Sequence, residues 1–151
     1  MASPILVAPP VERVVDRASA RGFVDAHIAP WGNDFERDGY IPEAVLTRMA
    51  EAGLWAPFLP ESVGGQGVSM VSLGEIHEEV GRGCSSVRSL LTVHTMASWT
   101  VQRWGTPAQR ERWLPSMATG DALGSFCLSE PEAGSDATGI RTTATPEGTG
   151  W

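Results

Sequence analysis

The segment from Phe126 to Gly139 constrains the fold more than any other part of this 151-residue chain. Its apolar approach, Leu123–Leu128, favours a buried strand. The polar continuation cannot extend that strand, because Pro131 lacks a backbone donor and Gly134 permits a positive φ. We therefore expect a strand that runs into a tight loop. Outward-facing amides and hydroxyls of such a loop can hold an anion or the polar edge of a planar cofactor.

The residues before this segment repeat with helical periodicity and carry helix start and stop signals. Helices are expected over residues 11–28, from Pro42 to a cap at Gly53, from Ser69 to a break at 81–83, from Ser85 or Ser86 to Trp104, and from Thr106 to a stop or bend at Pro115. Residues 31–40 and 54–67 are expected to be connections. In the third helix, Glu75 to Glu79 are expected on an exposed side, with Val71, Ile76 and Val80 buried.

After these helices the pattern changes, because residues 123–128 and 140–145 favour β-strands. The chain is therefore predicted to be mainly α, with a helical bundle over 11–120 and the first strands of a β-domain over 121–151, after a flexible arm at 1–10. Two strands without partners do not make a stable sheet. We therefore expect the chain to be the truncated front of a longer protein or one half of a split protein.

Charge and cysteine content exclude several classes of protein. The net charge is −7 and no dense Lys/Arg run occurs, so neither a nucleic-acid groove nor an anionic membrane surface is expected. The apolar N-terminus is too short to span a bilayer. Cys84 and Cys127 suggest no disulfide framework, which favours a reducing cytoplasm. His77-Glu78-Glu79 lacks the second histidine of a zinc helix and is expected on an exposed helix face, so no metal site is predicted.

Three motifs in the same order resemble the flavin-dependent acyl-CoA dehydrogenase family. They are Cys127–Asp136 (CLSEPEAGSD), Phe58–Gly67 (FLPESVGGQG) and Gly105–Pro115 (GTPAQRERWLP). The resemblance covers the chain from about residue 11 to 151. It implies the N-terminal helical domain and the start of the middle β-domain, FAD as cofactor, and oxidation of an acyl group held as a thioester on CoA or on an acyl carrier protein. It also implies a homo-oligomer at full length, or a partner chain that supplies the missing domains.

The resemblance assigns the cofactor-binding residues to the central segment. Phe126, Leu128 and Ser129 would contact the ring, Cys127 is assigned to cofactor binding with them, and Gly134 and Ser135 would lie where flavin and the thioester arm meet. A polar contact such as the Ser129 hydroxyl would tune the cofactor rather than perform the organic chemistry. From the residues alone, the segment is a strand that ends in a turn. The family base is a glutamate of the C-terminal domain, so we assign no catalytic residue in this chain.

Arg88, followed by Ser89 and Thr92, is the candidate substrate-binding group, together with Ser135. Family members that act on acyl groups with a distal carboxylate, such as glutaryl-CoA dehydrogenases, have a similar Arg-Ser in the helix that lines the acyl pocket. The segment also resembles acyl-ACP dehydrogenases of polyketide extender-unit pathways, which act on hydroxymalonyl or methoxymalonyl units. A guanidinium matches a carboxylate with two parallel hydrogen bonds. The alternative for Arg88 is a solvent-facing arginine or a salt bridge within the helix.

Two other functions stay open for the chain. It could be a non-catalytic helical module that docks a carrier protein or a second subunit, or an inactive truncated product.

Residue His94 is expected either in the core or in a pocket, and the core is favoured.

Overall fold

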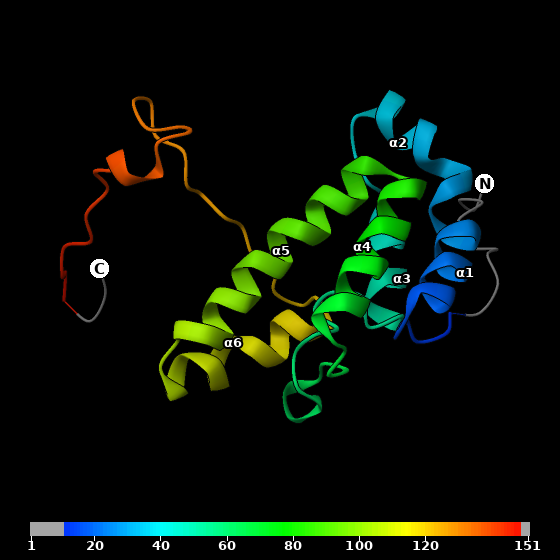
Figure 1. Cartoon of the computed structure of the whole chain (residues 1–151), viewed down its shortest axis with the longest axis horizontal. Coiled ribbons are helices and arrows are strands. Elements are labelled where there is room, and N and C mark those ends of the chain that lie inside the picture. Colours follow the sequence, from blue (N-terminus) through cyan, green and yellow to red (C-terminus); the bar gives the residue numbers. More distant parts are fainter. Residues whose placement is uncertain (1–10, 149–151) are drawn as a thin grey trace.

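The structure is a computed structural model that describes residues 11–148, and this part of the chain is mainly helical with no β-strand (Figure 1). The elements in chain order are α1 (Arg17–His27), η2 (Ala29–Trp31), α2 (Gly32–Asp38), α3 (Glu43–Glu51), η3 (Glu61–Val63), α4 (Met70–Gly83), α5 (Ser85–Trp104), α6 (Pro107–Thr119) and η4 (Ala137–Gly139). No helix among the described residues is long and apolar enough to cross a membrane.

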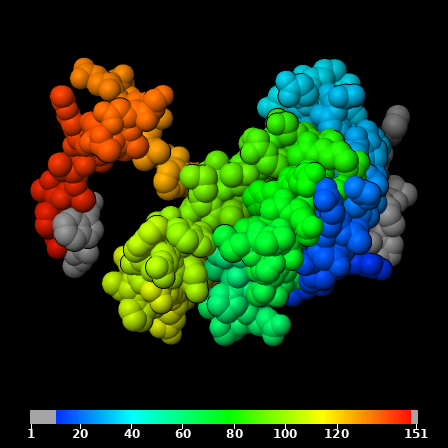
Figure 2. Space-filling view, in the orientation of Figure 1, coloured from blue at the N-terminus to red at the C-terminus, as the bar shows by residue number. Residues whose placement is uncertain are grey.

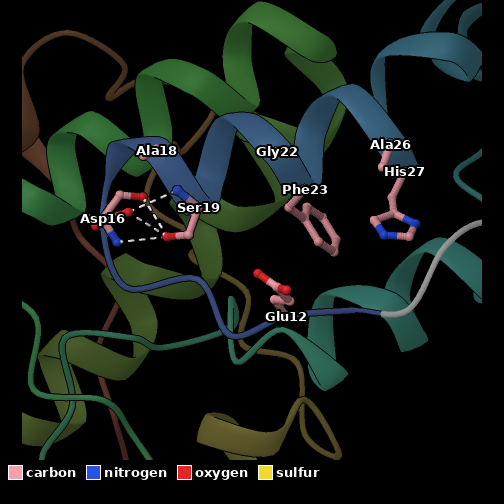
Figure 3. A pocket seen from close by; sticks show the side chains of 8 residues that line it. All are labelled: Glu12, Asp16, Ala18, Ser19, Gly22, Phe23, Ala26 and His27. Carbon is pink, nitrogen blue, oxygen red and sulfur yellow. Dashed lines mark hydrogen bonds between the residues drawn. The ribbon is translucent and has the colours of Figure 1, made fainter.

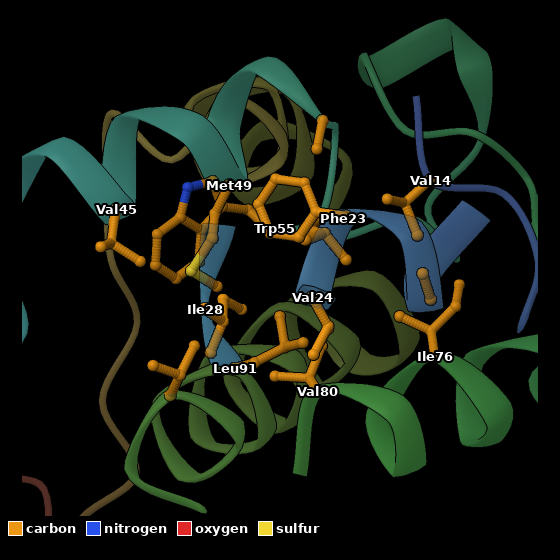
Figure 4. Packing of buried hydrophobic residues seen from close by; sticks show 14 of the residues in the cluster. Val14, Phe23, Val24, Ile28, Val45, Met49, Trp55, Ile76, Val80 and Leu91 are labelled. Atoms are coloured by element: carbon orange, nitrogen blue, oxygen red, sulfur yellow. The ribbon is translucent and has the colours of Figure 1, made fainter. Parts of the chain in front are cut away.

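The core lies where α1, α4 and α5 pack side by side and α3 covers them (Figure 4). Apolar side chains from all four helices and from the loop after α3 interlock there. They include Val24, Ile28, Val45, Met49, Trp55, Ile76, Val80 and Leu91, each at most 1% exposed. Burying such side chains stabilises a fold by about 1.5–3 kcal/mol each. The mainly helical fold expected from the sequence is therefore confirmed.

The first helix begins at Arg17 rather than at residue 11. Asp16 caps it, since the Asp16 carboxylate accepts from the Ser19 amide at 2.8 Å while Ser19 bonds back to the Asp16 amide. The residues before Asp16 bond elsewhere: the Val14 amide donates to Ala52 O at 2.9 Å, and the Gln66 side chain donates to Val14 O at 2.8 Å. These long-range bonds replace the helical ones that periodicity alone predicted.

A second difference is α2, which lies in the stretch expected to be a polar connection. These residues form a helix because Phe35, which is 4% exposed, packs in the core and anchors one face of α2. Gly32 fits only as glycine, since a Cβ there would lie 2.7 Å from Gly83 O. Gly39 then ends the helix with φ of 71°.

Some helix ends lie where the sequence predicted them, and others do not. Ser69 caps α4 and Thr106 caps α6, as predicted. However, α4 continues through the 81–83 stretch to Gly83, and α6 continues past Pro115 to Thr119. The residues after Pro115 include Met117 and Ala118, which are 5% and 4% exposed, so their packing outweighs one lost backbone bond.

Two exposure predictions for α4 are wrong. Val71 is 74% exposed, whereas Glu79 is 1% exposed. The Glu79 carboxylate bonds to Arg17 at 3.0 Å, Arg21 at 2.8 Å and Arg82 at 2.9 Å. Three guanidinium groups thus satisfy a buried carboxylate at the junction of α1 and α4.

The strands expected over 123–128 and 140–145 are not formed in the described chain. The chain after α6 stays against the helices up to Gly124, whose amide bonds to His94, and the residues beyond it leave the helices and stand apart from them (Figures 1 and 2). A strand needs a neighbour to take its backbone hydrogen bonds, and the described residues form isolated bridges, such as that between Glu130 and Ala133, in place of strands.

Candidate functional site

The first group of predicted site residues lies where α5 faces α4. Arg88 and Thr92 are one helical turn apart, with Arg88 Nη1 3.5 Å from Thr92 Oγ1, and the Thr92 hydroxyl donates to Arg88 O at 2.8 Å. On α4, the imidazole of His77 lies beside them, with Nδ1 3.2 Å from Thr92 Oγ1 and Nε2 3.4 Å from Thr95 Oγ1. The sequence had placed His77 on an exposed face, but it is half-buried in this interface.

Arg88 is partly buried and makes no ion pair with any carboxylate of residues 11–148. Its aliphatic stem passes Gly81, where an added Cβ would lie 3.4 Å from Arg88 Cγ. A guanidinium in such a position retains full capacity for an anionic ligand. The salt-bridged alternative considered from the sequence is therefore not seen. Ser89 points elsewhere: it is exposed, and no hydrogen bond of its side chain joins it to this group in the described chain.

The electrostatics of this group are set by burial and by Arg88. Burial lowers the pKa of His77 below its ordinary 6.5, and the charge of Arg88 lowers it further. The ring is therefore neutral at pH 7, and the group as a whole carries one positive charge, on Arg88.

The second group lies in the loop after α6, which is closed by one carboxylate. Glu130 accepts from the amides of Arg141 at 2.9 Å and Thr142 at 2.8 Å, and also from the Thr142 hydroxyl. These bonds lower the pKa of Glu130, that from the Thr142 hydroxyl most. Within the loop, the amide of Glu130 donates to Ala133 O at 3.0 Å. The tight polar loop expected from the sequence is thus present, although its flanking strands are not.

The residues predicted to hold a flavin are exposed around this loop. Phe126 and Leu128 are 40% and 44% exposed, and Cys127, Ser129, Gly134 and Ser135 are exposed as well. Nothing lies within 4 Å of a Cβ built on Gly134, so the tip leaves room for close approach to its backbone. Two apolar side chains followed by a free hydroxyl and an open glycine tip fit one face of a planar ring system. They lie on an exposed surface and do not enclose a pocket among the described residues.

The structure does not bring the two groups together. The loop stands away from the helices, and no hydrogen bond or ion pair of the described residues joins Arg88, Ser89 or Thr92 to residues 126–148 (Figures 1 and 2). Ser135, predicted to contact both flavin and substrate, lies with the flavin group only. The structure gives no group of three or more potential metal ligands among the described residues.

A separate hollow lies along α1 (Figure 3) and contains none of the predicted site residues. It measures about 530 Å³ and is lined by Glu12, Asp16, Ala18, Ser19, Gly22, Phe23, Ala26 and His27. His27 is 2% exposed and its ring lies 4.9 Å from that of Phe23. Burial lowers the pKa of His27, so the imidazole that lines this hollow is neutral at pH 7.

Sequence reasoning missed two residues of the candidate sites. His77 carried no signal, because its partners Thr92 and Thr95 lie on another helix whose rotation one sequence does not give. Glu130 stood inside the quoted motif but received no role. A carboxylate at the first residue of a Pro-containing turn is a common acceptor for loop amides, and that signal could have identified it.

Comparison with known proteins matches this architecture to one family. The family described as "Acyl-CoA dehydrogenase, N-terminal domain" matches residues 12–121. (2S)-Methylsuccinyl-CoA dehydrogenase of Cereibacter sphaeroides is 36% identical over 136 residues, covering 89% of this chain and 25% of that protein. Acryloyl-CoA reductase (NADH) of Anaerotignum propionicum is 34% identical over 125 residues, covering 83% of this chain and 32% of that protein.

Solved structures of proteins with related names have the same architecture. A crystal structure of glutaryl-CoA dehydrogenase from Mycobacterium smegmatis superposes with a TM-score of 0.80 at 35% identity, over 87% of this chain and 34% of that chain. Another, of a glutaryl-CoA dehydrogenase from the same organism in complex with FADH2, gives a TM-score of 0.77 at 31% identity. The chain thus spans a quarter to a third of the length of these relatives.

Proposed function

This chain belongs to the acyl-CoA dehydrogenase family, and we propose that it forms the N-terminal part of a flavin-dependent acyl-thioester dehydrogenase. The observation that carries the proposal is the family match over residues 12–121 together with the TM-score of 0.80 to a glutaryl-CoA dehydrogenase. Because the relatives are much longer, activity would require further domains, in the same polypeptide or in a partner chain. The acyl group would be carried as a thioester on CoA or on an acyl carrier protein.

We infer that FAD is the cofactor and that the loop after α6 supplies one wall of its site. Phe126 and Leu128 offer apolar surface to the ring, and the Ser129 hydroxyl offers a hydrogen bond to its polar edge. Bound FAD would accept the hydride released in α,β-dehydrogenation of the thioester. Glu130 keeps the loop closed through its bonds to Arg141 and Thr142, so that Gly134 and Ser135 stay at its tip.

Arg88 is the residue proposed to select the acyl group. Its guanidinium has no carboxylate partner within the described chain, and desolvating a cation without a partner is costly. A carboxylate at the distal end of the acyl chain would supply that partner through two charge-assisted hydrogen bonds. Thr92, whose hydroxyl faces Arg88 Nη1, would border the same site.

The names of two relatives support this choice of substrate class. Methylsuccinyl-CoA and glutaryl-CoA are both thioesters whose acyl group ends in a free carboxylate, and proteins named for them are 36% and 35% identical to this chain. A hydroxymalonyl unit on a carrier protein carries a carboxylate too, so the same arginine would serve it. Relatives named for short-chain acyl-CoA, 32% identical, act on groups with no such carboxylate, which makes the substrate experiment decisive.

The experiment compares Arg88→Ala with wild type for binding of glutaryl-CoA and butyryl-CoA, which differ by the terminal carboxylate. Hydrogen bonds to charged groups contribute about 1.5–3 kcal/mol, so Arg88→Ala should weaken glutaryl-CoA binding by roughly 10- to 150-fold. Butyryl-CoA affinity should change less than about 2-fold. Arg103→Ala, which removes an exposed arginine from the other end of α5, is the matched control and should change neither. Equal losses for both thioesters in Arg88→Ala would contradict the role.

A second candidate function follows from the packing. The two apolar clusters of the core contain no side chain from the segment after α6, and the helices contact the start of that segment through bonds such as that from the Gly124 amide to His94, so the helical part could fold as a unit that includes residues up to about 124. A non-catalytic module that docks a carrier protein or another subunit would have this property. A folded, monodisperse chain that takes up no flavin under any condition would favour this candidate.

A further inference from the structure

His77 occupies the α4 side of the interface that holds Arg88, and its hydrogen bonds define a direction of proton donation. The Thr92 hydroxyl has one proton, and it donates that proton to Arg88 O at 2.8 Å. Thr92 Oγ1 can then only accept from the imidazole, 3.2 Å away, so Nδ1 of His77 carries the ring proton. Nε2 is left as the acceptor and faces the Thr95 hydroxyl at 3.4 Å.

We propose that His77 is a positioning residue for the Arg88 carboxylate site and that it makes carboxylate binding stronger as the pH falls. This inference rests on the proposed role of Arg88. The Nδ1–H group fixes the Thr92 hydroxyl, and that oxygen lies 3.5 Å from Arg88 Nη1, where it restricts the guanidinium. A second proton on the ring places another positive charge next to the same ligand.

The charges around His77 give the sign of the pH effect. On α5 the charged group that acts on His77 is Arg88. On α1 the cations Arg17 and Arg21 are held by Glu78 and Glu79 of α4. Burial, and then Arg88, lower the pKa of His77, so the ligand-free ring is neutral at pH 7. A bound carboxylate offsets the charge of Arg88 and raises that pKa. Binding therefore takes up a proton and strengthens as the pH falls.

Three variants separate the positioning of Arg88 by the His77 hydrogen bond from the pH dependence caused by the charge of His77. His77→Asn keeps an N–H donor close to the Nδ1 position but does not titrate. His77→Leu removes both donor and charge. Glu78→Gln is the control, because Glu78 is the next residue on α4 and points to Arg17 instead.

The measurement is equilibrium binding of glutaryl-CoA and butyryl-CoA between pH 5.5 and 8, on the chain together with any polypeptide that its flavin requires. Butyryl-CoA corrects for titration of the CoA phosphates. In the wild type, the ratio of the two affinities should rise in favour of glutaryl-CoA as the pH falls. His77→Asn should keep the ratio seen at pH 8 but show no rise. His77→Leu should lower the pH 8 ratio by roughly 2- to 10-fold, the worth of one neutral hydrogen bond.

Two results would overturn the inference without touching the proposed function. One is a pH profile of His77→Asn that matches the wild type, and the other is an equal loss of both thioesters in His77→Leu. If Arg88→Ala leaves the affinity ratio unchanged, the carboxylate site itself fails. A readout on the unmodified chain covers variants that do not fold: the ring ¹⁵N shifts of His77 should show the neutral Nδ1–H tautomer at pH 7.5, and the Nε2–H tautomer would contradict the proposal.

Discussion

The Gly124 amide donates to Nδ1 of the buried His94 at 3.0 Å, and this bond ties the start of the extended segment to the middle of α5. Because Nδ1 accepts, Nε2 carries the proton and donates to Met117 O at 2.9 Å. One neutral imidazole thus joins α5, α6 and the chain that leads to the flavin-binding candidates. The core placement of His94 favoured from the sequence is confirmed, since the residue is 0% exposed.

His94 should make the fold sensitive to acid. Burial lowers its pKa below 6.5, although the hydrogen bond to Met117 acts in the opposite direction. Below pH 6.5 the unfolded chain binds a proton that the folded His94 does not, so the free energy of unfolding falls as the pH is lowered. Burial lowers the pKa of His27 and His77 as well, and they add to this slope.

Urea unfolding between pH 5 and 8 measures that slope. His94→Leu should reduce it and cost about 1–3 kcal/mol at pH 7.5, because Gly124 N–H and Met117 O lose their partner. An unchanged slope in His94→Leu would show that the folded ring takes up its proton normally.

Glu79 gives the fold a second pH dependence, in a lower range. Hydrogen bonds from Arg21, Arg82 and Arg17 lower its pKa from 4.5 to about 2. The stabilisation is complete above pH 4.5 and is lost as the pH falls towards 2. Glu79→Gln should therefore destabilise the chain at pH 7 more than Glu78→Gln does, because Glu78 is exposed and, within residues 11–148, forms an ion pair with Arg17 alone. Chemical denaturation of the two variants tests the order, and equal midpoints would contradict it.

Gly120 should not tolerate a side chain. Its φ is 83°, and an added Cβ would lie 2.3 Å from the indole of Trp55, which is 1% exposed. Gly120→Ala should cost at least about 2 kcal/mol, from the left-handed backbone and from the clash in the core. Gly22→Ala is the control: nothing lies near a Cβ in that helical position, so it should stabilise the chain by up to about 1 kcal/mol. Thermal melts of both variants test this: the Tm should fall in Gly120→Ala and should not fall in Gly22→Ala, and an unchanged Tm in Gly120→Ala would contradict the prediction.

The parts of the fold that were predictable from the sequence are those set by local chemistry. Thr106 followed by Pro107 is a helix start whatever lies around it, and the structure forms a capping box there. The start of α1 was not predictable, because the residues before Asp16 bond to Ala52 and Gln66, which lie far along the chain. A period of 3.6 says which residues share a face, but not which bonds compete for the backbone.

In the candidate sites, too, some features follow from the local sequence and others depend on packing between distant segments. The loop around Gly134 follows from its own glycine and proline, and Arg88 stood out because its neighbours resemble a family motif. The contact of His77 with Thr92 depends on how α4 and α5 are rotated about each other, which neither helix specifies alone. The expected strands depend on neighbours as well, so residues 123–128 form no strand. The flavin roles of Phe126, Leu128 and Ser129 stay a prediction.

The central claim is that this chain contributes one wall of a flavin site within an acyl-thioester dehydrogenase. The direct measurement is the visible absorption spectrum of the purified 151-residue chain, alone and after co-expression with the polypeptide encoded immediately downstream. The account predicts little or no flavin with the chain alone, and stoichiometric yellow cofactor with the partner. A folded chain that holds no flavin in either sample would contradict the claim and favour the docking module. Stoichiometric flavin on the chain alone would show that one wall is not all it provides.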